Sequence, residues 1–116
     1  MPDKPLFWLG SSRRDLQAFP PDARRVAGFQ LRRVQHGLEP NDRKLMTAVG
    51  PGVMEIRIHP GLEYRVFYVA KFTEGIYVLH AFQKRTGRTP KGDLELARDR
   101  FRALVMKRTT DHSRGR

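Results

Sequence analysis

Residues 53–88 read VMEIRIHPGLEYRVFYVAKFTEGIYVLHAFQKRTGR, and this stretch decides the fold. Its apolar residues alternate with other residues, as in β-strands, whose successive side chains point to opposite faces of a sheet. Two turn signals, one after His59 and one at Glu74–Gly75, divide the stretch into three parts. We therefore predict three consecutive antiparallel strands, over residues 53–59, 63–70 and 76–85.

The turn after the first of these strands decides which side chains are neighbours. A three-residue loop at 60–62 pairs Arg57 with Arg65 and leaves one sheet face wholly apolar, whereas a two-residue loop mixes the polar and apolar rows. We prefer the three-residue loop. Because like charges directly opposite each other destabilise a sheet, we expect an anion between the two arginines. Their forked guanidiniums suit a phosphate.

The third strand adds to the same face. If Glu74–Gly75 is a two-residue hairpin loop, Arg65 faces Lys84 and Phe67 faces Phe82. The face then gathers acid, base, cation and aromatic side chains: Glu55, Arg57, His59, Arg65, His80, Phe82 and Lys84. A solvated face of a basic protein is the alternative interpretation. The convergence of these residue types under one register favours a functional site.

The composition narrows the class of protein. The chain has 116 residues, which suits one domain, and a formal net charge of +11. The excess is spread along the chain, because the first 50 residues contain nine basic and five acidic side chains and the rest contain fourteen and seven. This charge predicts a polyanionic partner, most simply nucleic acid, and salt-sensitive binding. A membrane surface is a less favoured partner, because no amphipathic segment is suited to lie in lipid, and no run approaches transmembrane length.

The absence of cysteine excludes disulfides and thiolate metal sites. The first ten residues lack the apolar core of a signal peptide, so we expect a cytoplasmic protein. The remaining apolar patterns predict five further elements, listed by residue range: strands at 5–9 and 45–49 and helices at 13–19, 21–36 and 93–106.

The order of these elements predicts an α+β fold. Two N-terminal helices and a C-terminal helix would pack on a mainly antiparallel four-stranded sheet. We expect a single domain over residues 1–108 and a disordered basic tail over residues 109–116.

Five short strings occur along the chain in a recognisable order: MEIR (54–57), YRVFY (64–68), GIYVLHAFQKRT (75–86), TP (89–90) and LELAR (94–98). In this order and spacing they resemble the RelE/HigB superfamily of type II toxin–antitoxin toxins, and most closely its phage-derived HigB-like branch. The likeness extends over nearly all of residues 5–105. It implies the RelE-like microbial RNase fold.

The resemblance also implies a function. It indicates a ribosome-dependent endoribonuclease that cleaves mRNA and inhibits translation by attack of a ribose 2′-hydroxyl on the adjacent phosphate. The partners it implies are mRNA on the ribosome and a cognate antitoxin protein. It implies neither a metal nor a small-molecule cofactor.

The resemblance further implies that basic residues on the central strands carry the chemistry, at Arg57, Arg65, Lys84 and Arg85. The reaction needs cations for the transition state, a base for the 2′-hydroxyl and an acid for the leaving oxygen. We assign the transition-state charge to Arg57 and Arg65. Lys84 shares that role or acts as base.

Proton transfer and RNA binding fall to other side chains of the same face. Glu55, His59 and His80 are the candidates for proton transfer, and Phe82 is a candidate to stack an RNA base. We expect Arg85 and Arg88 to hold phosphates. Some relatives act through a tyrosine or histidine near the C-terminus. No tyrosine follows Tyr77 here and His112 falls in the expected tail, so the roles of acid and base stay open.

Two other functions remain open. The same face could bind nucleic acid without cleaving it, or the chain could be an inactive toxin-like scaffold for a protein partner. A zinc site from His59, His80 and Glu55 is not favoured, because their spacing matches no recurrent ligand motif.

Overall fold

The computed structural model describes residues 3–58, 64–85 and 87–114 of the chain. The described elements, in chain order, are β1 (Leu6–Trp8), α1 (Ser12–Gln17), α2 (Pro21–Gln35), β2 (Arg43–Leu45), β3 (Val53–Ile58), β4 (Tyr64–Val69), β5 (Ile76–Gln83) and α3 (Lys91–Arg114). Their order agrees with the predicted order of strands and helices. The loop predicted at residues 60–62 lies outside the described residues.

The strands form a five-stranded sheet in the order β1-β5-β4-β3-β2. β1 is parallel to β5, and the other neighbours are antiparallel. The five predicted strands are all present, but the prediction of a four-stranded sheet was short by one, because β1 also joins the sheet, at its edge. Its partner lies about 70 residues away in sequence, as the pairing of Leu6 with Ile76 shows, so no turn signal indicated the pairing.

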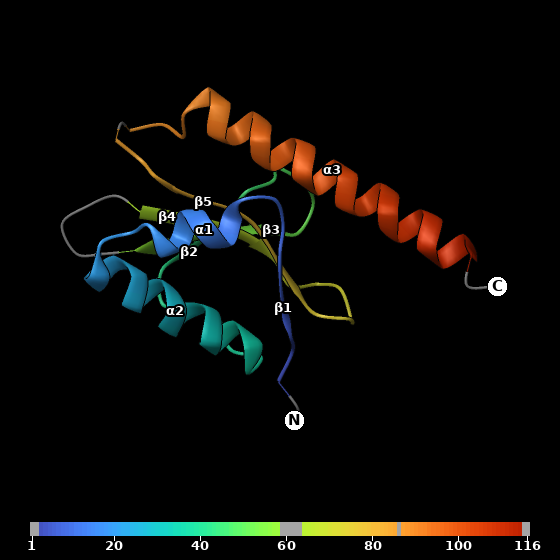
Figure 1. The fold of residues 1–116 in the computed structure, drawn as a ribbon, viewed down its shortest axis with the longest axis horizontal. Helices are drawn as coiled ribbons and strands as arrows, with labels where there is room; N and C mark the ends of the chain where they lie inside the picture. The colour runs from blue at the N-terminus through green and yellow to red at the C-terminus, as the bar shows by residue number, and fades with distance from the viewer. Residues whose placement is uncertain (1–2, 59–63, 86, 115–116) are drawn as a thin grey trace.

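Helices cover both faces of this sheet, with α1 and α2 on one side and α3 on the other (Figure 1). One core packs α1 and α2 residues such as Leu16 and Leu31 against Ile56 and Val66 of the sheet. A second core packs the α3 residues Ala97, Phe101 and Leu104 against the opposite face, including Phe67 and Leu79. These residues of α3 are thus a core contact, whereas Val105 on the same helix is exposed.

The pairing of β3 with β4 agrees with the predicted register. Arg57 lies opposite Arg65, and Ile58 lies opposite Tyr64. The two strands alternate strictly, so their apolar rows can meet on one face in only one register. The sequence pattern alone was sufficient to predict this pairing.

The predicted pairing of β4 with β5 was wrong. Arg65 lies opposite Phe82 rather than Lys84, and Phe67 lies opposite His80 rather than Phe82. The six residues 70–75 connect the strands, so Glu74–Gly75 is not a two-residue hairpin loop. The register also shifts between Phe67 and Tyr68.

This irregularity affects which side chains face α3. Leu79 packs in the core beneath α3, and its neighbour His80 bonds Asp93 of the same helix. Two consecutive β5 side chains therefore face the same side, which a regular strand would not allow. Between Arg65 and Phe67 the observed pairing differs from the predicted one by two residues. Because side chains alternate with a period of two, this shift leaves His80 and Phe82 on the predicted face.

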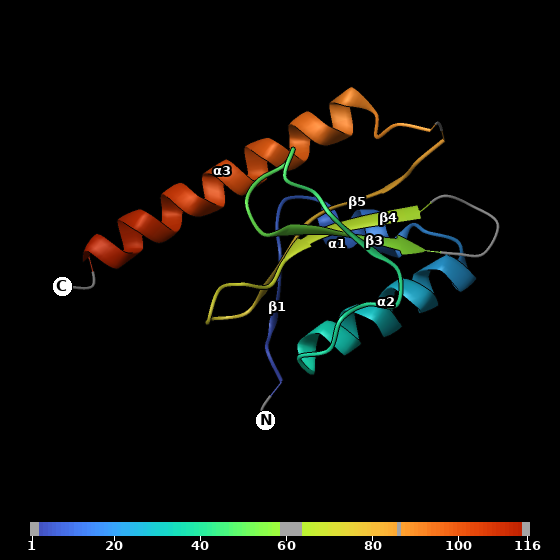
Figure 2. The same cartoon turned by 180° about the vertical axis from the view of Figure 1, so that it is seen from behind.

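Two element boundaries also differ from the prediction. β2 was expected at residues 45–49 but ends at Leu45, because the chain turns where the Val49 amide donates to the Met46 carbonyl. The helix α3 continues through residues 109–114, where a disordered tail was expected. The hydroxyls of Thr109 and Thr110 donate to carbonyls one turn earlier, and no glycine or proline interrupts residues 93–114. The second half of α3 projects beyond the strands in both views (Figures 1 and 2).

Gly50 is required where the chain passes beneath α3. A Cβ atom at this position would overlap the Phe101 ring. We expect Gly50→Ala to lower the free energy of unfolding by about 1–3 kcal/mol, because overpacking displaces that ring. Denaturant titration measures the loss. Gly28→Ala is the matched control, since Gly28 lies in α2 with open space around it and should gain about 0.5–1 kcal/mol. Equal effects of the two substitutions would contradict the packing argument.

The projecting half of α3 is held by an ion pair. Arg108 donates to both carboxylate oxygens of Glu74, at 2.6 and 3.1 Å, and these bonds lower the pKa of Glu74 to about 2. A lowered folded-state pKa contributes stability above the unfolded value near 4.5, and that contribution is lost as the pH falls towards 2. We expect wild type to be more stable than Glu74→Gln at pH 7 and the difference to shrink between those two values. Denaturant titrations across that range test this; a difference independent of pH would contradict it.

Candidate active site under and beside the C-terminal helix

Three charged residues form a cluster on the α3 face of the sheet. Glu55 and Arg57 are two residues apart in β3 and therefore point to the same side, and Arg65 lies opposite Arg57 in β4. The Oε1 atom of Glu55 is 3.4 Å from Arg57 Nε and 3.6 Å from Arg65 Nε. The anion expected between the two arginines is thus present within the chain itself.

Burial divides this Glu55–Arg57–Arg65 cluster into an inner and an outer part. The side chains of Glu55 and Arg65 are 2% and 6% exposed, whereas that of Arg57 is 35% exposed. Asp42 lies 3.8 Å from Arg57 on its outer side. Of the three, Arg57 is therefore the residue that a substrate can reach.

The second carboxylate oxygen of Glu55, Oε2, has an unusual environment. Oε2 is buried, and no described residue donates a hydrogen bond to it. A buried carboxylate oxygen without a donor carries a free-energy cost that is usually avoided. This oxygen can accept a proton or a hydrogen bond without first giving up a partner.

His80 is held on both sides of its ring. Nε2 lies 2.6 Å from Asp93 Oδ1, and Nδ1 lies 3.5 Å from an Arg100 nitrogen. A guanidinium only donates, so the network assigns the ring proton to Nε2, which donates to Asp93. The ring also stacks on Phe82, with centroids 5.0 Å apart. His80 is consequently placed to fix α3 on the sheet.

The sequence did not indicate Asp93 or Arg100. Arg100 donates to the Leu79 carbonyl and to the Ser11 hydroxyl, at 2.8 and 3.0 Å, and burial lowers the pKa of its guanidinium. A signal was present, because residue 100 falls on the apolar side of the helix between Ala97 and Phe101. A charged residue at a core-facing position needs internal partners.

Other predicted site residues lie around the cluster. Phe82 is buried between His80 and Phe67, so it packs the core instead of offering a face to an RNA base. Lys84 is partly exposed and Arg85 and Arg88 are exposed, in the segment after β5. Together these three form a basic rim.

No hydrogen bond or ion pair joins Lys84 or Arg85 of the basic rim to the cluster within the described part of the chain. His59 lies outside the described residues, so its role stays a prediction. Among the residues that the structure describes, no three histidine or acidic side chains are grouped to hold a metal ion.

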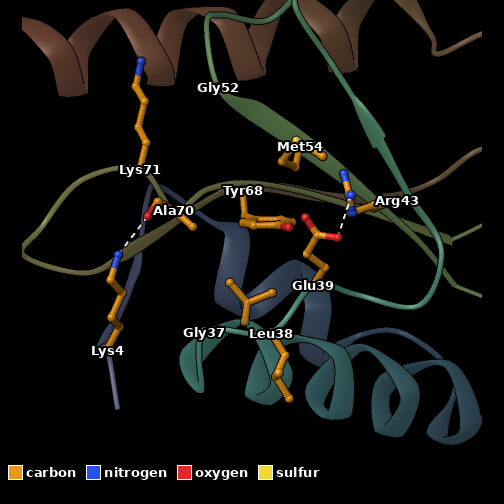
Figure 3. Close-up of a pocket in the computed structure, with 11 residues that line it drawn as sticks. Lys4, Gly37, Leu38, Glu39, Arg43, Gly52, Met54, Tyr68, Ala70 and Lys71 are labelled. Carbon is orange, nitrogen blue, oxygen red and sulfur yellow. Dashed lines mark hydrogen bonds and ion pairs between the residues drawn. The ribbon is translucent and has the colours of Figure 1, made fainter. Parts of the chain in front are cut away.

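A cavity of about 390 Å³ opens on the opposite face of the sheet (Figure 3). Its wall includes Tyr68 and Met54, and the ion pair of Arg43 with Glu39 lies at its rim. Burial raises the pKa of Tyr68 to about 12, so this phenol stays protonated. The cavity is not part of the cluster, because Tyr68 belongs to the core beneath α1 and α2.

Fold and site together define a strongly basic α+β domain with arginine, glutamate and histidine on the central antiparallel strands beneath a C-terminal helix. Residues 14–102 match the model of the family described as phage derived protein Gp49-like (DUF891), and the chain belongs to this family. A search of the curated proteins finds no match. The phage-derived part of the predicted resemblance is confirmed, and the RelE/HigB assignment stays a prediction.

No helix in the described residues is long and apolar enough to cross a membrane.

The buried ion pair gives a test of the cluster. In Glu55→Gln, Arg65 keeps its buried charge but loses the carboxylate beside it, so we expect the free energy of unfolding to fall by about 2–4 kcal/mol. Glu95→Gln is the control, because Glu95 makes an exposed pair with Lys91 that should contribute less than about 0.5 kcal/mol. Denaturant titration at pH 7 measures both. A loss at Glu55 no larger than that at Glu95 would show that Arg65 does not depend on this carboxylate.

Proposed function

We propose that this protein is the toxin of a type II toxin–antitoxin system, a ribosome-dependent endoribonuclease that cleaves mRNA and inhibits translation. Three observations support the proposal: membership of a phage-derived family, a net charge of +11, and the sequence strings that resemble the RelE/HigB superfamily on the strands that carry the cluster. RNA is the polyanion that such a charge favours. Cytoplasmic location and an antitoxin partner belong to the same proposal.

The observation that carries the proposal is the position of Arg57. Its guanidinium is partly exposed, and Glu55 on one side and Asp42 on the other restrict its orientation. A cation held in place before the substrate arrives stabilises developing charge without a reorganisation cost. Arg57 is therefore placed to contact a phosphate, whereas Arg65 and Glu55 act by positioning it.

The proposed reaction needs no metal. A base removes the proton of a ribose 2′-hydroxyl, and that oxygen bonds to the adjacent phosphorus. The bond from phosphorus to the 5′-oxygen breaks, and an acid donates a proton to this leaving oxygen. The products are a 2′,3′-cyclic phosphate and a 5′-hydroxyl end.

The structure narrows the candidates for proton transfer. Lys84 is partly exposed, whereas Glu55 is buried and out of reach of a substrate. His80 would have to release Asp93 or Arg100 before it could exchange a proton with RNA. We propose Lys84 for proton transfer and Arg85 and Arg88 for phosphate binding along the basic rim, whereas Glu55, which is 2% exposed, positions Arg57.

A non-catalytic RNA-binding module is the second candidate. It is favoured by the burial of Glu55, Arg65 and His80, which leaves mainly cations exposed. Such a module would bind RNA through Arg57 and the basic rim in a salt-dependent manner and leave it intact. Cleavage separates the two candidates.

Induced expression in a bacterial host tests the proposal. We expect wild type to arrest growth and to create new 5′-hydroxyl ends inside coding regions, and Arg57→Ala to reduce cleavage about 100-fold or more, as removal of a preorganised transition-state contact does. Arg25→Ala is the control, because Arg25 has a 75% exposed side chain far from the cluster in sequence. It should cleave as wild type does.

Purified ribosomes programmed with mRNA, compared with mRNA alone, test the dependence on the ribosome. Circular dichroism confirms that each variant is folded. RNA binding by folded wild type without any cleavage would favour the non-catalytic module. Full cleavage by Arg57→Ala would remove Arg57 from the chemistry.

A further inference from the structure

A second surface lies at the β1 edge of the sheet, away from Arg57 of β3. β1 is an edge strand, and the helix α3 passes beside it, leaving a groove of about 1610 Å³ between them. Residues of β1, of the loop before β5 and of the second half of α3 line this groove. Figure 2 shows this half of α3 extending away from the strands beside β1.

The outer edge of β1 offers unpaired backbone groups. The Pro5 carbonyl accepts from Ile76 and the Leu9 amide donates to Val78, so the odd-numbered residues face β5. By alternation the amides and carbonyls of Leu6 and Trp8 point outward. No described residue bonds them, and both residues line the groove.

The side chains beside this edge are apolar and aromatic. Phe7 is 39% exposed, although it packs on Tyr77 with ring centroids 5.0 Å apart. Leu104 and Ala103 of α3 form the facing wall. An exposed strand edge next to apolar side chains is the arrangement that binds an extended peptide by strand addition.

The charged residues that line the β1–α3 groove indicate which kind of peptide it binds. Arg13 and Lys107 line the groove, are exposed, and form no ion pair with a described residue. Arg108 is neutralised by Glu74, and Asp111 is the remaining acidic group. The uncompensated charge is therefore positive, which favours acidic side chains in the bound segment.

We propose that the β1–α3 groove binds an extended acidic segment of a partner protein, which adds a strand to β1 and places alternate apolar side chains against Phe7 and Ala103. The identity of that partner as the antitoxin rests on the proposed function. The binding itself does not, because Arg57 and the basic rim take no part in it. RNA is disfavoured as the occupant, because its backbone cannot pair with a strand edge.

The test uses an acetylated octapeptide of alternating glutamate and valine, its lysine–valine counterpart, and an eight-nucleotide RNA. Trp8, the single tryptophan of the chain, is a lining residue of the groove whose side chain packs against the core beneath α1 and α2, and it reports binding by fluorescence. Amide NMR spectra locate the binding site. We expect the acidic peptide to saturate, to shift the Leu6 and Trp8 amides, and to bind at least about tenfold more tightly than the basic peptide.

Leu6→Pro is the decisive variant. Proline removes the outward amide of Leu6 but no bond to β5, so the sheet is retained. We expect about tenfold weaker binding from the loss of this donor and its strand geometry. Leu6→Ala keeps the amide and is the control. Should Leu6→Pro fail to fold, Arg13→Glu with Lys107→Glu replaces it and should weaken the acidic peptide by a similar factor.

Several outcomes would overturn the inference. These are no saturation by the acidic peptide, equal binding to wild type and to the variants, shifts confined to other residues, or preferential binding of the RNA or of a second copy of the chain in the groove. Peptide binding without RNA cleavage by wild type would support the groove and contradict the nuclease. Cleavage without peptide binding would support the nuclease and contradict the groove.

Discussion

The carboxylate of Glu55 between Arg57 and Arg65 is the interaction on which the α3 face of the sheet depends. Two arginines opposite each other repel, and one of them is buried. The carboxylate offsets both the repulsion and the loss of hydration. The register of β3 and β4 is thus specified twice, by the apolar row on one face and by this charge arrangement on the other.

Because the inner charges are compensated within the sheet, the apolar side of α3 can pack on the same sheet face. α3 packs Ala97, Phe101 and Leu104 over Phe67 and Leu79, and leaves Arg57 at the accessible margin. The residues of this sheet face therefore have two different roles. Buried groups hold the geometry, and the partly exposed arginine and the basic rim beyond β5 meet the solvent.

The pairing set by alternation within neighbouring strands could be predicted from the sequence. The contacts between residues distant in sequence could not. Arg57 opposite Arg65 followed from two strictly alternating strands and a short loop. The pairing of β4 with β5 did not, because neither the irregularity near Leu79 nor the six-residue connection has a clear signature. The partners of His80 were missed for the same reason, since Asp93 and Arg100 reach it only once α3 has docked.

Arg100 connects the two surfaces of the molecule. Its side chain lines the β1–α3 groove, and its guanidinium also bonds the Leu79 carbonyl and faces Nδ1 of His80. His80 in turn holds Asp93 at the first turn of α3. Any acidic group in the groove therefore competes with the sheet for a cation that helps to hold the helix over the cluster. Coupling between distant sites requires such a shared group with different contacts in the two states.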